Sequence, residues 1–493
     1  MLLSSLLRVS ASLYAPAGHK AGAFDEDFRG LTYGQAAATG TETAMALQLL
    51  NGTATSGAVC LDGTPGGFYF SKATAEANAN DWQIYFQGGG WCYDDKDCWH
   101  RSNSHLGSTK GALATVTVGG LMDSDCTKNP DFCNFNRVFL IYCDGNSFSG
   151  NRDLPYPVAE DGEKANLYFR GRRIVDEVLK ALSADFGLAA AKNVLLTGCS
   201  AGGLATCVAC ERARRAAAPA QHLRACFCPR RFVAHSLLAA LTPPTHFCLT
   251  LCSYLHTDYI AEQLASKYAT GVTKYKATSM SGFFLQHKTV EGLDVYPTQM
   301  QNVFQMQNAT GGVNAACIAS LNASEQWQCN FAQHAYAHTT SPTFPLNSAL
   351  DYWQTLCIYT SELPPGWPNQ KGTENGVCGT AKGWESCAKD PEKCTATQMG
   401  TMNQYITDFD TTIKTSGPTF GKAGNGAFIH SCHTHCEAQN GEFFRFRIGG
   451  ISMQKAVSTW WNAPVTDPAA GHTYSPCMYN TNTLPHRCNP TCH

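Results

Sequence analysis

The chain has 493 residues, only 15% of them are charged, and the formal net charge at pH 7 is −2. Soluble domains carry about 25% charged residues on average, and a nearly neutral chain lacks the field that attracts a polyanion, so we expect no nucleic-acid partner. Apolar residues make up 44% of the chain, enough for a substantial core. No stretch approaches the roughly 20 consecutive apolar residues of a membrane-spanning helix, so we expect no membrane span.

Residues 1–56 show no strong periodicity and are predicted to be a leader with a poorly defined N-terminal segment. From residue 57 to residue 493 we expect a single domain, in which apolar strand-like runs alternate with helical patterns. This alternation is typical of an α/β fold with a largely parallel central sheet. The predicted elements are strands over Trp82–Gln87, Arg137–Cys143 and Asn193–Thr197, a helix with Ile174, Val178, Leu179 and Leu182 on one face, and an Ala-rich helix that Pro219 should end.

An atypical insertion is predicted at about residues 221–254. This segment has no clean helix or strand period, contains no acidic residue and carries four of the cysteines. A translated intron and a genuine surface insertion explain these features equally well. Beyond residue 360, frequent Gly, Asn, Thr, Pro and Cys predict long loops tied by disulfides.

The 24 cysteines are spread from Cys60 to Cys492, and most stand outside any zinc-type pair of CxxC motifs. Such usage indicates disulfides and an oxidising compartment. Zinc is the weaker alternative, because the nearest candidates lack a second ligand pair at suitable spacing. These candidates are Cys207, Cys210, Cys226 and Cys228. Cys92 and Cys98 are close enough in sequence to pair through a turn, and we expect this disulfide.

N-glycosylation sequons begin at Asn51, Asn308 and Asn322, and they agree with a secretory route. The N-terminus fits this route less well, because Arg8 interrupts its apolar stretch and no basic region precedes it. We nevertheless expect a secreted, extracellular protein, since the cysteine usage and the sequons both favour it.

The most specific motif is Gly198-Cys-Ser-Ala-Gly202, a GxSxG between an apolar strand and a helix. A serine on such a tight strand-to-helix turn needs small neighbours, because the backbone there is strained and lifts the hydroxyl above the sheet. The motif therefore predicts Ser200 as a nucleophile, with the N–H of Ala201 as an oxyanion donor. The triglycine Gly88–Gly90 with Trp91, which follows the first predicted strand, suits the second donor.

A nucleophilic serine needs a histidine to take its proton and a carboxylate to orient that histidine. Chain order in α/β-hydrolases is Ser, acid, His, but order alone does not choose among the downstream aspartates. They are Asp258, Asp294, Asp351, Asp390, Asp408, Asp410 and Asp467. Asp351 follows an apolar segment that we interpret as a sheet strand, and such a strand would place Asp351 at the site. His430, His433 and His435 compete as the base, and a His-x-His metal site is the weaker alternative there.

Several segments together resemble the pectin acetylesterase family of plants, in family order over residues 57 to 493. The animal protein carboxylesterase Notum belongs to the same wider family. The segments are Ala58–Gly63, Gly88–Cys92, Tyr142–Gly150, Gly198–Gly203, Asn347–Gln354 and Cys488–Cys492. The resemblance implies an α/β-hydrolase-like fold, with Ser200 as nucleophile, Asp351 as acid and His435 as base. It places Gly90, Trp91 and Ala201 at the oxyanion hole.

By the same resemblance, we expect a serine carboxylesterase that removes acetyl groups from a cell-wall polysaccharide such as pectin. No metal or organic cofactor is expected, and we expect a monomer located outside the cell or in the cell wall. Two alternatives remain: a Notum-like protein deacylase that removes lipid, and a catalytically inactive carbohydrate-binding homologue. Acyl-chain specificity depends on pocket depth, which the sequence does not give.

Overall fold

The computed structural model describes residues 43–160, 162–206, 255–362, 378–416, 420–466, 473–474 and 489–492. A ten-stranded sheet runs through these residues in the order β16-β13-β10-β9-β8-β3-β5-β2-β1-β4. Its strands are β1 (Met45–Leu49), β2 (Gly67–Ser71), β3 (Asp81–Phe86), β4 (Thr115–Val116), β5 (Asn136–Leu140), β8 (Asn193–Cys199), β9 (Lys274–Met280), β10 (Leu346–Ser348), β13 (Ala427–His430) and β16 (Thr473–Tyr474). The strands from β16 to β5 are parallel, and β2, β1 and β4 add an antiparallel edge.

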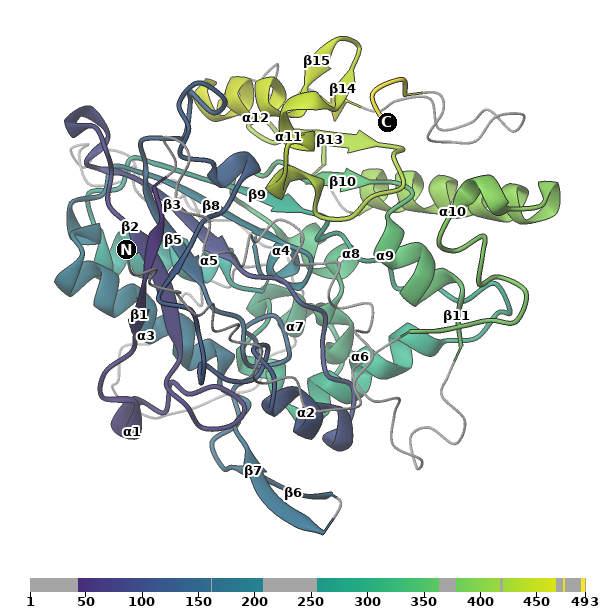
Figure 1. Ribbon diagram of the computed structural model, residues 1–493, viewed down its shortest axis with the longest axis horizontal. Coiled ribbons are helices and arrows are strands. Elements are labelled where there is room, and N and C mark those ends of the chain that lie inside the picture. The colour runs from purple at the N-terminus through teal and green to yellow at the C-terminus, as the bar shows by residue number, and fades with distance from the viewer. Residues whose placement is uncertain are drawn as a thin grey trace, which may run out of the picture.

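Helices surround this sheet, and three small antiparallel pairs lie outside it (Figure 1). The helices are α1 (Thr53–Ser56), α2 (Asp95–Ser102), α3 (Gly171–Asp185), α4 (Ala201–Ala205), α5 (Thr257–Gln263), α6 (Val295–Met306), α7 (Ala315–Ser320), α8 (Ala332–Ala335), α9 (Tyr352–Gln354), α10 (Ala396–Thr415), α11 (Glu442–Arg445) and α12 (Met453–Asn462). The small pairs are β6 (Tyr156–Glu160) with β7 (Glu163–Leu167), β11 (Ser361–Glu362) with β12 (Gly379–Thr380), and β14 (Arg447–Ile448) with β15 (Ile451–Ser452). The predicted α/β-hydrolase-like class with a largely parallel sheet is confirmed.

The strand register places α3 and α12 on opposite faces of the sheet. Lys276 on β9 packs under Trp460 of α12, with Nζ 5.0 Å from the ring centre. Phe68 on β2 is in register with Ser279 of β9 through the intervening strands. Ser279 and Lys276 are three residues apart on one strand, so Phe68 and Lys276 face opposite sides. Phe68 packs on Phe186, which caps α3, with ring centroids 5.4 Å apart.

The predicted strands and the predicted helix are present, with small shifts at their ends. β5 stops at Leu140, earlier than expected, and β8 continues to Cys199, directly before the GxSxG serine. The predicted helix is α3, and it buries the apolar face that the sequence indicates. Helix α4 is described only as far as Ala205. The rest of the Ala-rich segment, the zinc-candidate cysteines and the predicted insertion at 221–254 lie outside the described residues.

The predicted leader boundary at residue 56 is wrong, because β1 is part of the central sheet. Residues 46–49 pair with β2, and Met45 and Ala46 pair with β4. Only Met45 is fully buried on this strand, whereas Leu49 is 45% exposed. Backbone hydrogen bonds to β2 and β4 therefore hold this strand in the sheet more than an alternating apolar face does. Because that alternation is missing, the sequence shows no strand period here.

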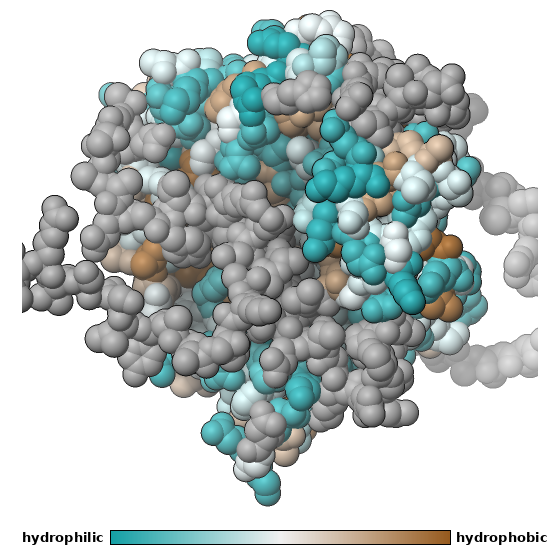
Figure 2. All heavy atoms as spheres, turned by 45° about the vertical axis from the view of Figure 1, so that its right-hand side comes forward, coloured by the Kyte–Doolittle hydropathy of each residue, from teal (hydrophilic) through white to brown (hydrophobic). Residues whose placement is uncertain are grey.

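All cysteines of the described residues are paired, in eight disulfides. The predicted Cys92–Cys98 bond is among them. Large exposed apolar side chains are few and scattered within the described residues, and Figure 2 shows hydrophilic and neutral residues over most of the coloured surface of that face. Among the helices of the described part, none is long and apolar enough to span a membrane.

Candidate active site

Four loops that carry predicted site residues follow the carboxyl ends of parallel strands. Ser200 comes directly after β8, Gly90 lies four residues after β3, Asp351 three residues after β10, and His435 five residues after β13. The carboxyl ends of parallel strands lie at one edge of a sheet, where α/β proteins place their ligand sites. The topology therefore gathers residues from distant parts of the sequence at a single edge.

Ser200 occupies a strained turn between β8 and α4. Its φ is 58° and its ψ is −127°, a left-handed conformation that non-glycine residues rarely adopt, and its N–H donates to the carbonyl of Met280 at 3.0 Å. The two glycines of the motif are required for space. A Cβ on Gly202 would collide with the carbonyl of Phe86, and one on Gly198 would collide with the carbonyl of Gly202. The predicted nucleophile turn is thus present in its strained form.

Asp351 and His435 form a buried pair. His435 Nδ1 lies 2.8 Å from Asp351 Oδ2, with the carboxylate fully buried and the imidazole 5% exposed. The other carboxylate oxygen accepts from the N–H of Gln354 at 2.9 Å and so caps α9. This second bond fixes the carboxylate plane, and the carboxylate in turn orients the imidazole.

The other two candidate histidines have different partners. His430 Nε2 lies 2.6 Å from Glu437 Oε1, in a pair that is buried on both sides. His433 Nε2 meets the hydroxyl of Thr355 at 3.1 Å on a partly exposed surface. Of the three, His435 alone is brought to Asp351 in the described residues. The Ser200 hydroxyl is buried and makes no hydrogen bond to a described residue; catalytic bonds of this kind are often long before substrate binds.

Glu437 was missed by the sequence reasoning. Burial alone would raise its pKa, but the adjacent His430, with a further contribution from His435, outweighs burial and lowers the pKa. A carboxylate in this position keeps negative charge near the loop that carries the candidate base. In the sequence, only its position directly after Cys436 indicated that Glu437 lies near the site.

The triglycine loop packs against the Ser200 turn. A Cβ on Gly88 would stand 2.9 Å from Ser200 Cβ, and Gly90 adopts a φ of 59°, so glycine is needed at both positions. Tyr142 donates from its hydroxyl to the Gly90 carbonyl at 2.7 Å and accepts from the N–H of Ser147 at 2.9 Å. Tyr142 therefore connects the triglycine loop to Ser147 and holds that loop in place. Within the described residues, the N–H of Gly90 donates no hydrogen bond.

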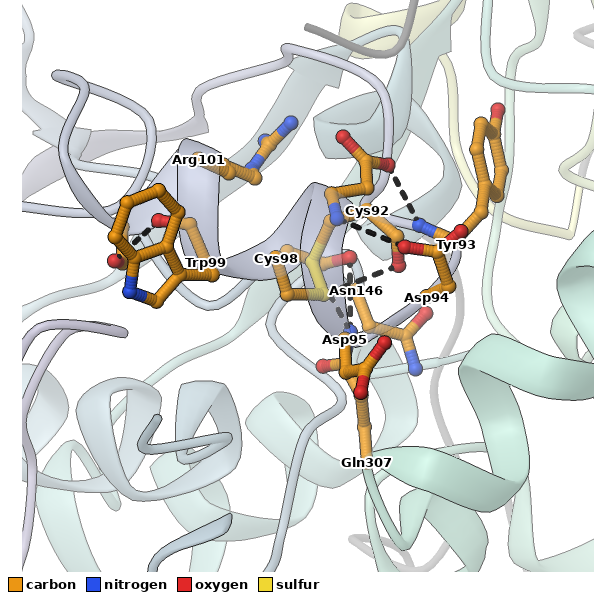
Figure 3. Close-up of a disulfide and its surroundings, with 12 residues drawn as sticks. Cys92, Tyr93, Asp94, Asp95, Cys98, Trp99, Arg101, Asn146 and Gln307 are labelled. Atoms are coloured by element: carbon orange, nitrogen blue, oxygen red, sulfur yellow. Dashed lines mark hydrogen bonds between the residues drawn. A yellow bond between two sulfur atoms is a disulfide. The ribbon is translucent and has the colours of Figure 1, made fainter. Parts of the chain in front are cut away.

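The segment after the triglycine is closed by the Cys92–Cys98 disulfide, drawn in Figure 3. Inside this small loop, Asp97 accepts from the N–H of Tyr93 at 2.8 Å, and its own N–H donates to Asp94 at 2.8 Å. Burial raises the pKa of Asp97 to about 7, although the bond from Tyr93 opposes the shift.

The raised pKa of Asp97 predicts a pH-dependent stability. The folded state keeps this proton up to about pH 7, whereas the unfolded chain releases it near the ordinary value of 3.8. The stability that the neutral carboxyl provides is therefore present below pH 4 and is lost as the pH rises to 7. Asp97→Asn cannot ionise and still accepts from Tyr93, so its melting temperature should fall less than that of wild type between pH 4.5 and 7.5. Asp95→Asn on the same helix is the control, and equal slopes in wild type and Asp97→Asn would contradict the assignment.

A serine on a strand-to-helix turn, with an Asp–His pair at the same sheet edge, is the arrangement found in α/β-hydrolase esterases. Comparison with known proteins gives the class and the family. The family model for pectinacetylesterases matches residues 38–226 and 250–493, so the chain belongs to the pectinacetylesterase family and is a carboxylic ester hydrolase. The family model does not match residues 227–249, which lie within the segment predicted as an atypical insertion.

Individual relatives agree with this family. Pectin acetylesterase 11 of Arabidopsis thaliana is 26% identical over 453 residues, covering 91% of this chain and 93% of the relative. Human palmitoleoyl-protein carboxylesterase Notum is 25% identical over 322 residues, covering 64% of this chain and 52% of the human protein. The crystal structure of the Wnt deacylase Notum from Drosophila matches with a TM-score of 0.63 at 19% identity, over 92% of this chain and all of that one. The last similarity establishes the fold.

Proposed function

We propose that the protein is a serine esterase that removes acetyl groups from a cell-wall polysaccharide such as pectin. The observation that carries this proposal is the buried Asp351–His435 pair, which lies at the same sheet edge as the strained Ser200 turn. Membership of the pectinacetylesterase family supports the acetylated substrate.

The proposed mechanism has two steps and uses no metal or organic cofactor. His435 takes the proton of Ser200, whose oxygen attacks the ester carbonyl, while Asp351 holds the imidazole and stabilises its charged form. The amides of Gly90, Trp91 and Ala201 receive the oxyanion. His435 then passes the proton to the leaving sugar hydroxyl. A water that the same histidine activates hydrolyses the acyl-enzyme and releases acetate.

An aromatic cluster beside His435 supports a small acyl group. Trp91, Phe284 and Trp353 contact one another with ring centroids 4.9 to 5.5 Å apart. Phe284 and Trp353 stand 6.3 and 6.4 Å from the His435 ring, and Trp353 is only 9% exposed. Close-packed rings leave little room for a long chain next to the candidate base, whereas an acetyl group needs only a shallow pocket.

The competing proposal is removal of a lipid from a protein, as the printed names of the Notum relatives describe. The extent of sequence similarity favours a polysaccharide substrate, since the alignment covers 93% of the plant relative and only 52% of the human one. An inactive carbohydrate-binding homologue is disfavoured because Ser200, Asp351 and His435 are all retained.

Chain-length preference tests the acyl group. Wild type should hydrolyse p-nitrophenyl acetate in strong preference to the octanoate. Trp353→Ala should raise the octanoate-to-acetate ratio of kcat/KM by about tenfold or more, since each newly accommodated methylene contributes about 0.8 kcal/mol. Trp461→Ala truncates a buried tryptophan that packs on Phe132, and it is the control that should leave the ratio unchanged. A wild-type enzyme that prefers octanoate would favour the lipid-removing alternative.

Secretion to the cell wall is part of the proposal. The eight disulfides suit an oxidising compartment. The three sequon asparagines, Asn51, Asn308 and Asn322, are all exposed, as glycosylation requires. We propose a monomer that acts directly on acetylated polysaccharide.

A further inference from the structure

One disulfide joins the two residues next to the candidate nucleophile and the candidate base. Cys199 directly precedes Ser200, and Cys436 directly follows His435. The two cysteines are separated by 237 residues in sequence, yet their Cα atoms are 5.7 Å apart. Both are buried. Their sulfur atoms and one nitrogen of His435 all lie within 4.8 Å of one another.

The sheet topology alone does not bring these two loops together. Cys199 ends β8, and Cys436 lies in the loop after β13, with β9 and β10 between the two strands. Three strand spacings amount to about 14 Å. The loop that carries His435 must therefore cross the ends of β10 and β9, and the disulfide holds it at β8.

The backbone on both sides of the disulfide is in the left-handed region. Ser200 has a φ of 58° and Cys436 a φ of 61°. Such conformations persist only where the surroundings enforce them. The end of β9 contributes as well, because Met280 accepts from the N–H of Ser200 and the Ser281 hydroxyl accepts from the N–H of Cys436, each at 3.0 Å.

The His435 ring is consequently restrained from two directions. Asp351 holds Nδ1 on one side, and the covalent link through Cys436 ties the same residue to β8, the strand that ends directly before Ser200. We propose that the Cys199–Cys436 disulfide is a positioning element for the Ser200–His435 pair, so that esterase turnover requires this bond to be oxidised. The inference rests on the proposed function of these two residues.

The first test removes the bond in the double variant C199S/C436S, which keeps side chains of similar size. A displacement of about 1 Å in a catalytic group can cost up to about a hundredfold in rate. We expect kcat for p-nitrophenyl acetate to fall tenfold to a hundredfold, with KM within about twofold of wild type, at a temperature well below the melting point. The rate at which a fluorophosphonate labels Ser200 should fall by the same factor, because that reaction needs the Ser200–His435 pair but no acyl pocket.

The matched control is C126S/C133S. Cys126–Cys133 closes a short loop just before β5, at the amino end of the sheet and away from the candidate site. Its loss should lower the melting temperature and leave kcat and the labelling rate unchanged. A C199S/C436S variant that melts earlier but keeps wild-type kcat would overturn the inference and leave the proposed function intact. An inactive wild type would instead refute the proposed function.

The second test uses wild type and does not depend on the folding of a variant. A dithiol reductant converts the disulfide to two thiols and is itself oxidised to a cyclic disulfide. Samples taken during this reaction are alkylated and mapped by mass spectrometry, beside residual activity and circular dichroism. Activity should fall in step with reduction of Cys199–Cys436 while the fold persists, and reoxidation should restore it. If activity is lost as another disulfide is reduced, or as the whole protein unfolds, the inference is contradicted.

Discussion

Ser200→Ala is expected to lower kcat by several orders of magnitude while KM and the melting temperature stay close to wild type. The substitution removes the attacking oxygen and leaves only binding and oxyanion stabilisation. The fold should tolerate it, because the Ser200 hydroxyl makes no hydrogen bond within the described residues and its loss leaves no partner unsatisfied. Acetate release and p-nitrophenyl acetate turnover, measured beside thermal unfolding, check both parts. Activity within about tenfold of wild type would exclude Ser200 as the nucleophile.

His435→Ala is expected to abolish turnover, whereas His433→Ala should keep most of it. Only His435 meets Asp351, while His433 bonds the hydroxyl of Thr355 on a partly exposed surface. The two substitutions are chemically identical and lie two residues apart, so each controls for the other. The measurement is kcat/KM across pH 5 to 9. If His433→Ala is the inactive variant, the choice among the three histidines is wrong.

His430→Ala should behave differently from both. Its buried partner Glu437 would lose the hydrogen bond that His430 Nε2 donates, and leaving a buried acceptor unsatisfied typically costs about 1–3 kcal/mol. We therefore expect a lower melting temperature, together with kcat that is retained in the molecules that remain folded.

The strained turn of the candidate nucleophile could be predicted from the sequence because its determinants are local. Small residues around Ser200, an apolar strand before it and a helix after it lie within a few residues of each other, and the strained φ follows from that arrangement. Asp351 and His435 were different. Seven aspartates lie downstream of Ser200 and three histidines competed as the base. The choice came from family motifs, since the contact between Asp351 and His435 depends on β10 pairing with β13.

Features that depend on long-range contacts could not be read from the sequence. Strand β1 has a single fully buried side chain, so its place in the sheet appears only through pairing with β2 and β4. The Cys92–Cys98 pair was predictable because its loop is short, but connectivity over 237 residues, as in Cys199–Cys436, cannot be deduced from spacing. The rings around His435 come from segments that are far apart in the sequence, so the size of the proposed acyl site could not be read from it either.

Acetate release from acetylated pectin, by wild type and Ser200→Ala side by side, tests the central claim most directly. The account predicts steady release of acetate by wild type, without added metal or cofactor, and release at least about a thousandfold slower by the folded variant. Equal release by the two proteins would contradict the serine mechanism. A wild type that hydrolyses octanoyl esters but frees no acetate from pectin would contradict the proposed substrate.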